Sequence, residues 1–213
     1  PVFLSLVSDP TFTNCRFLGN WYTALGVIGE SIAQDVLWKI RSVAGRLNMP
    51  YYLNSQLTVG LGATLSMQPG VRVKCYNGSI LVQRAFQAEG RTQPDSMIVF
   101  TSYRDDAYGG DSNGDGGNSS PGYSDWSYIQ IDGTAIDAQC RFRNVLFRFG
   151  GSGSTQGAIR AVNSSPSVDS CLFEYNTVGV SVEGSSNPTI HGSSFLGNQY
   201  YAVNNTGNAF CVA

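Results

Sequence analysis

Short runs of alternating apolar and polar residues recur along the middle of the chain, separated by turn signals. Leu57–Val59, Leu65–Met67 and Val71–Val73 each place an apolar side chain at every second position, and Pro69–Gly70 marks a turn. Because successive side chains of a strand point to opposite faces, these runs predict short strands with one buried face. Further strands are expected at Ile80–Val82, Met97–Thr101 and Trp126–Ile131.

The C-terminal third of the chain contains a repeat. The segments Pro166–Gly184 and Pro188–Gly207 both carry a Phe seven residues after the Pro and an Asn ten residues after it, with a period of 22 residues. The repeated residues are Phe173 and Phe195, and Asn176 and Asn198.

Two other segments share parts of this pattern. Pro10 opens a third copy, with Phe17 and Asn20 at the same offsets and Cys15 at the position of Cys171. The segment containing Phe147 aligns with that of Phe173 and makes a longer coil of 26 residues, with the extra length in a Gly-rich turn.

Self-similarity at a fixed period is typical of stacked architectures. A repeat of about 22 residues with short alternating runs fits one coil of a parallel β-helix, whereas the Leu-x-x-Leu-x-Leu pattern of leucine-rich repeats is absent. We therefore predict an all-β chain folded as a right-handed parallel β-helix. Asn tolerates left-handed turns, and stacked Asn side chains can hydrogen-bond along a stack, so Asn176 and Asn198 are expected at coil corners.

The chain divides into three predicted parts. Residues 1–29 form an N-terminal coil, 30–48 a short helical insertion, and 49–213 the β-helix, interrupted by a long loop over 105–125. The apolar positions that favour a helix are Ile32, Val36, Ile40, Val43 and Leu47, although Val36–Ile40 also reads as a strand.

The loop over 105–125 is rich in Gly and Asp. Asp111–Gly116 matches D-x-[DN]-x-[DN]-G, which spaces oxygen atoms for calcium, but the twelfth position is Gly122 instead of the Glu of an EF-hand. Five aspartates within 21 residues repel one another unless they are solvated or neutralised. The sequence predicts a Ca2+ site, and a solvated turn-rich loop is the alternative. The expected ligands are Asp105, Asp106, Asp111, Asn113, Asp115 and Asp125.

Part of the chain resembles a known group of proteins. The stretches PYYL, LTV, GATLSMQPGVRVK and FTSYRDDAYGGDSNGDG, over about residues 49–150, are similar to bacterial secreted or cell-surface right-handed parallel β-helix repeat proteins. The resemblance implies this fold and an extracellular or cell-surface location. Members of that group include adhesins, surface-layer proteins and matrix proteins, and related β-helices include polysaccharide lyases and hydrolases.

Composition narrows the classes of function. Only 13% of residues are charged, the net charge is −2, and no basic stripe suggests nucleic acid. The chain contains no run of 18 apolar residues, so the sequence predicts no membrane-spanning helix. The five cysteines lack CxxC spacing, which excludes a zinc site of that type and leaves two interpretations, buried thiols or disulfides. The chain has a single histidine, His191, so a metal site built from several histidines is excluded. The start at Pro1, without Met, indicates a mature or excised segment.

Three functions fit these features. The first is an extracellular structural or adhesive protein that stacks end to end, because the runs Val2–Val7 and Ala209–Ala213 are strand-like at both ends and exposed strand edges invite another chain. The second is a carbohydrate-binding module, with flat aromatic side chains that stack on sugars. The aromatic candidates are Tyr123, Trp126, Tyr128, Tyr200 and Tyr201.

The third function is a polysaccharide lyase or hydrolase. A hydrolase needs two facing carboxylates, and the candidate pairs are Asp132 with Asp137, and Asp169 with Glu174. No spacing fixes either pair, so no catalytic residue is assigned. The alternating arginines, Arg141, Arg143 and Arg148, indicate a solvated outer face, with an anionic-sugar groove as the alternative.

Overall fold

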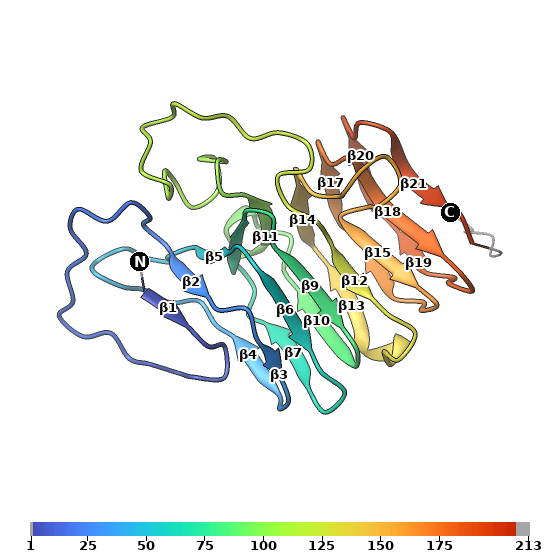
Figure 1. Ribbon diagram of the computed structural model, residues 1–213, viewed down its shortest axis with the longest axis horizontal. Coiled ribbons are helices and arrows are strands. Elements are labelled where there is room, and N and C mark those ends of the chain that lie inside the picture. Colours follow the sequence, from blue (N-terminus) through green and yellow to red (C-terminus); the bar gives the residue numbers. More distant parts are fainter. Residues whose placement is uncertain (1, 208–213) are drawn as a thin grey trace.

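The computed structural model describes residues 2–207, which form three parallel sheets wound into a β-helix (Figure 1). From β2 onward the chain visits three sheets, named A, B and C, in that fixed order, and each strand pairs with its counterparts in the neighbouring coils. Sheet A consists of β1 (Val2–Leu4), β2 (Leu25–Val27), β5 (Tyr51–Leu53), β8 (Arg72–Cys75), β11 (Ile98–Ser102), β14 (Val145–Arg148), β17 (Leu172–Glu174) and β20 (Ser194–Leu196).

The other two sheets complete each coil. Sheet B consists of β3 (Ser31–Ile32), β6 (Gln56–Val59), β9 (Ser79–Val82), β12 (Ile129–Ile131), β15 (Ile159–Val162), β18 (Val178–Glu183) and β21 (Tyr201–Asn205). Sheet C consists of β4 (Val36–Trp38), β7 (Thr64–Met67), β10 (Ala85–Glu89), β13 (Cys140–Arg143), β16 (Ser167–Asp169) and β19 (Thr189–His191). Two 3-10 turns, η1 (Pro94–Ser96) and η2 (Asp137–Gln139), lie between strands.

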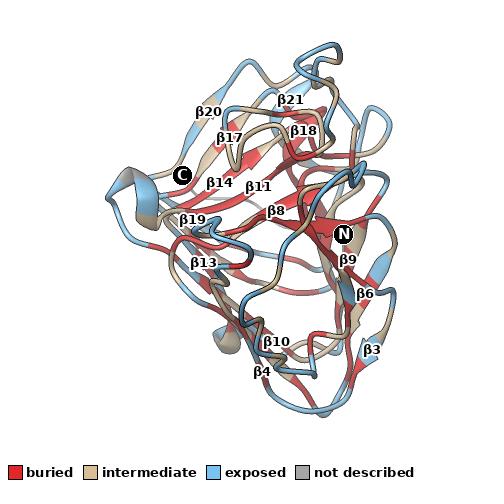
Figure 2. Cartoon of the chain, turned by 90° about the vertical axis from the view of Figure 1, so that its left-hand side faces the viewer, coloured by how far each residue is buried: buried red, intermediate tan, exposed pale blue. Residues whose placement is uncertain are grey.

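A ladder of phenylalanines runs through the core beneath sheet A. The register pairs Phe100 with Phe147, Phe147 with Phe173, and Phe173 with Phe195. Their rings stack with centroid separations of 5.7, 4.9 and 4.8 Å. Figure 2 shows buried residues concentrated in the strands of the inner coils and exposed residues mostly in the turns. The Phe repeat seen in the sequence therefore marks one core position of successive coils.

The corner between sheets A and B repeats as well. A left-handed residue occupies it in three coils, with φ of 61° at Phe149, 54° at Tyr175 and 61° at Gly197. The prediction that the repeated Asn takes this conformation is wrong by one position, because the left-handed residue precedes Asn176 and Asn198.

The repeated Asn forms the expected ladder between coils. Asn176 is fully buried, its Oδ1 accepts from the Gly150 N–H at 2.9 Å, and its Nδ2 donates to the Phe147 carbonyl at 3.0 Å. One coil later, Asn198 Oδ1 accepts from the Asn176 N–H at 3.1 Å. The side chain thus satisfies backbone groups that the turn leaves without strand partners.

The structure corrects the prediction for the N-terminal part. Residues 30–48 are not a helical insertion, because β3 and β4 lie there and pair with β6 and β7 as an ordinary part of a coil. The Pro10 copy is not a standard coil either, because residues 5–24 connect β1 directly to its neighbour β2 and contain no strand. Strand pairing with the neighbouring coil therefore outweighed the local pattern in residues 30–48.

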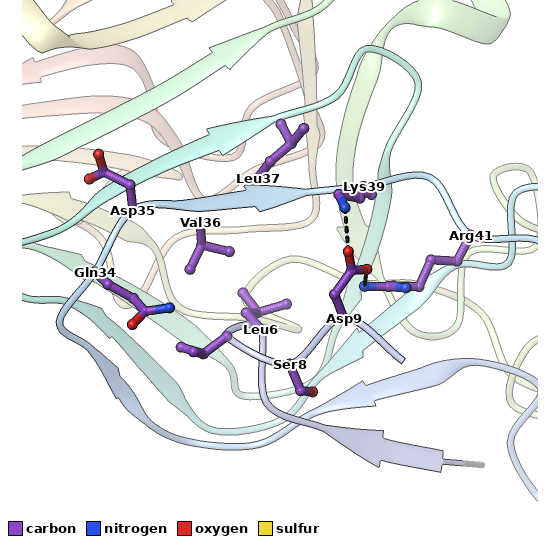
Figure 3. Close-up of a pocket in the computed structure, with 10 residues that line it drawn as sticks. Leu6, Ser8, Asp9, Gln34, Asp35, Val36, Leu37, Lys39 and Arg41 are labelled. Carbon is purple, nitrogen blue, oxygen red and sulfur yellow. Dashed lines mark hydrogen bonds and ion pairs between the residues drawn. The ribbon is translucent and has the colours of Figure 1, made fainter. Parts of the chain in front are cut away.

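Residues 5–24 close the N-terminal end of the stack. Leu6 is buried, and Phe12 and Phe17 pack against the core. Figure 3 shows Asp9 between Lys39 and Arg41, which it contacts at 2.5 and 2.8 Å. These two ion pairs hold residues 5–24 against the chain that directly follows β4.

The Asn ladder gives a stability prediction. In Asn176→Ala the buried Gly150 N–H and Phe147 carbonyl lose their partners, so we expect the free energy of unfolding to fall by about 2–4 kcal/mol. Urea denaturation followed by circular dichroism measures the change. The matched control is Asn187→Ala at an exposed position, which should shift the same quantity by less than about 0.5 kcal/mol. Equal, small effects of both substitutions would contradict the ladder's contribution.

Candidate functional site

The Asp/Gly loop, residues 105–125, folds back onto sheet A, where it lies beside residues 5–24 and above β8 (Figure 1). Lys74 Nζ on β8 donates to the Gly110 carbonyl at 2.5 Å, and the Thr23 N–H donates to the Ser112 carbonyl at 2.7 Å. The loop therefore covers the outer face of the sheet instead of projecting from the molecule.

Lys74 is the unexpected member of this site. Alternation along β8 turns its side chain away from the core, yet the loop covers it completely and leaves it 0% exposed. Burial lowers the pKa of Lys74 to about 8, and the nearby charges of Asp106, Asp105 and Asp111 oppose that shift. A buried ammonium group thus faces the carboxylates of the Asp/Gly loop.

Asp105 and Asp125, two of the predicted metal ligands, instead form ion pairs with arginines. Asp105 is buried, and its Oδ2 accepts from Arg148 Nη1 at 2.8 Å and from the Thr101 hydroxyl at 2.5 Å. Asp125 accepts from Arg104 Nη1 at 3.1 Å. Two further cations reach the loop from strands of sheet A, Lys74 from β8 and Arg148 from β14.

Three of the predicted ligands do come together. Asp106, Asp111 and Asp115 each offer a carboxylate oxygen within 4.8 Å of the other two. Asp111 Oδ1 accepts from the Gly114 N–H at 2.7 Å, which orders the turn of the D-x-[DN]-x-[DN]-G stretch. We define these three residues as the acidic cluster. Asn113 lies beside it and donates to Asp115 at 2.8 Å.

The members of the acidic cluster differ in the direction of their pKa shifts. Burial raises the pKa of Asp106, the charge of Lys74 opposes that rise, and the like charges of Asp111 and Asp115 add to it. The Ser119 hydroxyl lowers the pKa of Asp115 by donating to its carboxylate, together with backbone N–H groups of the turn. Asp106 Oδ1 is fully buried and has no hydrogen-bond partner among the described residues. The cluster therefore has one carboxylate whose charge is poorly compensated by hydrogen bonds.

The aromatic residues and arginines that the sequence offers as sugar contacts lie in different environments. Trp126 belongs to the core, and its indole N–H donates to the Arg148 carbonyl at 2.7 Å, so it cannot form a sugar platform. Exposed aromatic surface remains at Tyr123, Tyr200 and Tyr201. The three arginines each pair with an acid, namely Arg141 with Glu89, Arg143 with Asp169, and Arg148 with both Asp105 and Glu174.

The four carboxylates of the candidate hydrolase pairs each contact another residue. Asp169 lies on β16 of sheet C and contacts His191 and Arg143, whereas Glu174 lies on β17 of sheet A. Asp132 accepts from the Thr134 N–H of its own turn, and Asp137 accepts from the Ser165 N–H. Each of these carboxylates is therefore engaged by another group of the protein, and Asp169 and Glu174 belong to different sheets.

The cysteines of the described residues are free thiols. Cys75, Cys140 and Cys171 are buried, and burial raises the pKa of Cys140 to about 11 and that of Cys171 to about 12. Cys15 lies in the N-terminal segment and does not share the environment of Cys171. Cys211 and the run Ala209–Ala213 lie outside the described residues.

Comparison of the chain with protein-family models, with curated proteins and with solved structures gives no match. Within residues 2–207, no helix is long and apolar enough to cross a membrane.

Lys74 gives a pH prediction. Between pH 8 and 10.5 the unfolded chain holds a proton on this amine that the folded chain has released, so the free energy of unfolding rises with pH in this window. We expect the wild type to gain about 3 kcal/mol relative to Lys74→Met between pH 8 and pH 10.5. Urea denaturation of both proteins across this range measures the difference.

The design includes a matched control. Arg91→Met removes an exposed positive charge outside the loop and reports the general effect of losing one. A difference between wild type and Lys74→Met that stays constant from pH 8 to pH 10.5 would contradict a buried ammonium at this position.

Proposed function

We propose that this chain is an extracellular structural or adhesive β-helix protein that associates with a second copy through its C-terminal coil. Its rigid stack of coils, its Gly-rich composition with only 13% charged residues, and its resemblance to bacterial secreted or cell-surface β-helix proteins support this proposal. Carbohydrate binding is the second candidate function, and it is favoured by a groove lined by Trp21, Tyr22 and residues of the Asp/Gly loop.

The observation that carries the proposal is a change in burial at the last described coil. Val168, Phe173 and Val180 are each 0% exposed. Their register partners in the next coil are Ile190, Phe195 and Val203, which are only partly buried. Core positions that are fully buried in the preceding coil are thus only partly buried in the last described coil.

Backbone edges add to this apolar end. The strands β19, β20 and β21 are the outermost strands of their sheets, and β19 and β20 each have one edge without a strand partner among the described residues. Leu196 and Tyr201 are also about half exposed on the same coil. An open edge beside exposed apolar side chains favours pairing with another chain.

The opposite end supports one mode of association over another. Because residues 5–24 cover the N-terminal end, a head-to-tail filament would have to displace them. A twofold contact that pairs two C-terminal coils needs no such change and closes as a dimer. We therefore propose a symmetric pair of C-terminal coils in place of the end-to-end stack expected from the sequence. Such a pair can present the Asp/Gly loops of both copies to a surface.

Sedimentation velocity tests the association. We expect a monomer–dimer equilibrium for the wild type, and we expect Leu196→Lys combined with Tyr201→Lys to shift it towards monomer, because charges on an edge coil oppose pairing. The control is Leu61→Lys, an equally exposed leucine of an internal coil, which should leave the equilibrium unchanged. A wild type that stays monomeric at millimolar concentration would overturn the proposal.

We also propose that the acidic cluster binds Ca2+. Oxygen-only ligands, the spacing of Asp111 and Asp115, and the buried unpartnered oxygen of Asp106 support this. Lys74 and Arg148 already neutralise part of the loop, so the site calls for one divalent ion at most.

A thermal and calorimetric titration tests the calcium site. With a dissociation constant of about 0.1–1 mM, typical of extracellular modules, 10 mM CaCl2 should stabilise the protein by about 1.4–2.7 kcal/mol. We expect Asp106→Asn to abolish this gain and Asp95→Asn, at an exposed position outside the loop, to retain it. No heat of binding and no stabilisation of the wild type at 10 mM CaCl2 would contradict the proposal.

A further inference from the structure

A groove lies between the N-terminal segment and the Asp/Gly loop, on the outer side of sheet A. Its volume is about 410 Å³. Trp21 and Tyr22 form one wall, Tyr103 and Arg104 form another, and the Asp/Gly loop contributes the polar side chains Asn113, Asp115, Ser119 and Ser120. None of these aromatic residues was among the sugar-stacking candidates expected from the sequence.

The two walls are held in place by backbone contacts. The Thr23 N–H donates to the Ser112 carbonyl at 2.7 Å, and a side chain at Gly114 would meet the Trp21 carbonyl oxygen at 2.8 Å. Gly114 has φ of 71°, a left-handed conformation that other residues adopt only with strain. The groove is therefore a fixed feature of the fold, created by the close approach of two loops.

Aromatic rings continue beneath and beside the groove. Tyr22 stacks on the buried Tyr52 with ring centroids 4.9 Å apart, and Tyr76 packs against Tyr103 at 4.6 Å. Trp21, in contrast, is 85% exposed. A large aromatic face in water, next to supported aromatic rings, is a typical surface for stacking a flat ligand.

The amide of Asn113 has a fixed orientation beside the groove. Asn113 Nδ2 donates to Asp115 and to the Ser119 hydroxyl, at 2.8 and 3.1 Å, which sets the orientation of the amide. Asn113 Oδ1 is buried and has no hydrogen-bond partner within residues 2–207. An acceptor oriented in this way suits a hydroxyl donor from a ligand.

Charge selects among the possible ligands. Arg104 is the one cation among the described residues that line the groove, and it donates to the Tyr103 hydroxyl and pairs with Asp125 at 3.1 Å. Asp115 brings a negative charge, so an anionic polymer would meet repulsion instead of an unpaired cation. Aromatic faces, oriented hydroxyl and amide groups and no free positive charge together fit an uncharged, hydroxyl-rich ligand.

We propose that this groove binds a neutral oligosaccharide, with a sugar ring stacked on Trp21 and hydroxyl groups bonded to Asn113 and Ser119. The site is separate from the C-terminal coil, so it does not depend on self-association. It gives the adhesive role a ligand of stated chemistry on a different face of the molecule.

Tryptophan fluorescence and calorimetry test this site directly. Because Trp38 and Trp126 are buried in the core, a ligand that stacks on Trp21 changes the emission of the single exposed tryptophan. The probes are cellohexaose, xylohexaose and chitohexaose, with hexagalacturonate as an anionic comparison. We expect saturable binding of at least one neutral probe and affinity weakened at least ten-fold in Trp21→Ala.

Two further variants make the test specific. Leu18→Ala removes another exposed apolar side chain of the same segment and should bind like the wild type. Trp21→Phe keeps an aromatic face and should retain calorimetric binding while losing the fluorescence change. Binding of none of the neutral probes, unchanged affinity in Trp21→Ala, or preference for hexagalacturonate would each overturn the proposal. A monomeric protein that still binds would refute the coil pairing alone.

Discussion

Parallel strand pairing at a constant register is the constraint on which the rest of this structure depends. Each coil must return to the same three sheets, so equivalent positions in successive coils lie directly above one another. Phe147, Phe173 and Phe195 consequently stack ring on ring, and Asn176 and Asn198 form a ladder at the corner. The stacked aromatic rings in the core, and the hydrogen bonds that Asn side chains make to backbone groups at the corner, allow coils of only three short strands to remain ordered.

The same stacking explains where chemistry can appear. Side chains inside the coils are fixed by packing, so variable features arise in the turns and on the outer faces. The longest turn, the Asp/Gly loop, lies on sheet A because Lys74 and Arg148 supply cations beneath its aspartates. These contacts bring the acidic cluster and the aromatic groove to one side of the stack, while the open coil lies at its end.

The sequence predicted most of the fold and only part of the site. The 22-residue repeat identified the β-helix, and alternation located β6, β7, β8, β9 and β11, because both signals are local and periodic. Residues 30–48 were predicted as a helix because two short strands leave apolar residues at spacings that also suit a helical face.

The contacts of the loop could not be inferred in the same way. Asp105 and Arg148 are separated by 43 positions in the chain, and Lys74 and Gly110 by 36. Only the register of the coils brings them together. Trp21 and Tyr22 were likewise missed, because their segment was expected to form a regular coil instead of a wall beside the loop.

Hydrogen–deuterium exchange at several protein concentrations tests the central claim, that the C-terminal coil is the surface through which two copies meet. The account predicts that amides of β19, β20 and β21 become more protected as concentration rises, while amides of the internal strands β11 and β14 stay unchanged. Protection of the C-terminal strands that is independent of concentration, or that changes equally in the internal strands, would contradict it.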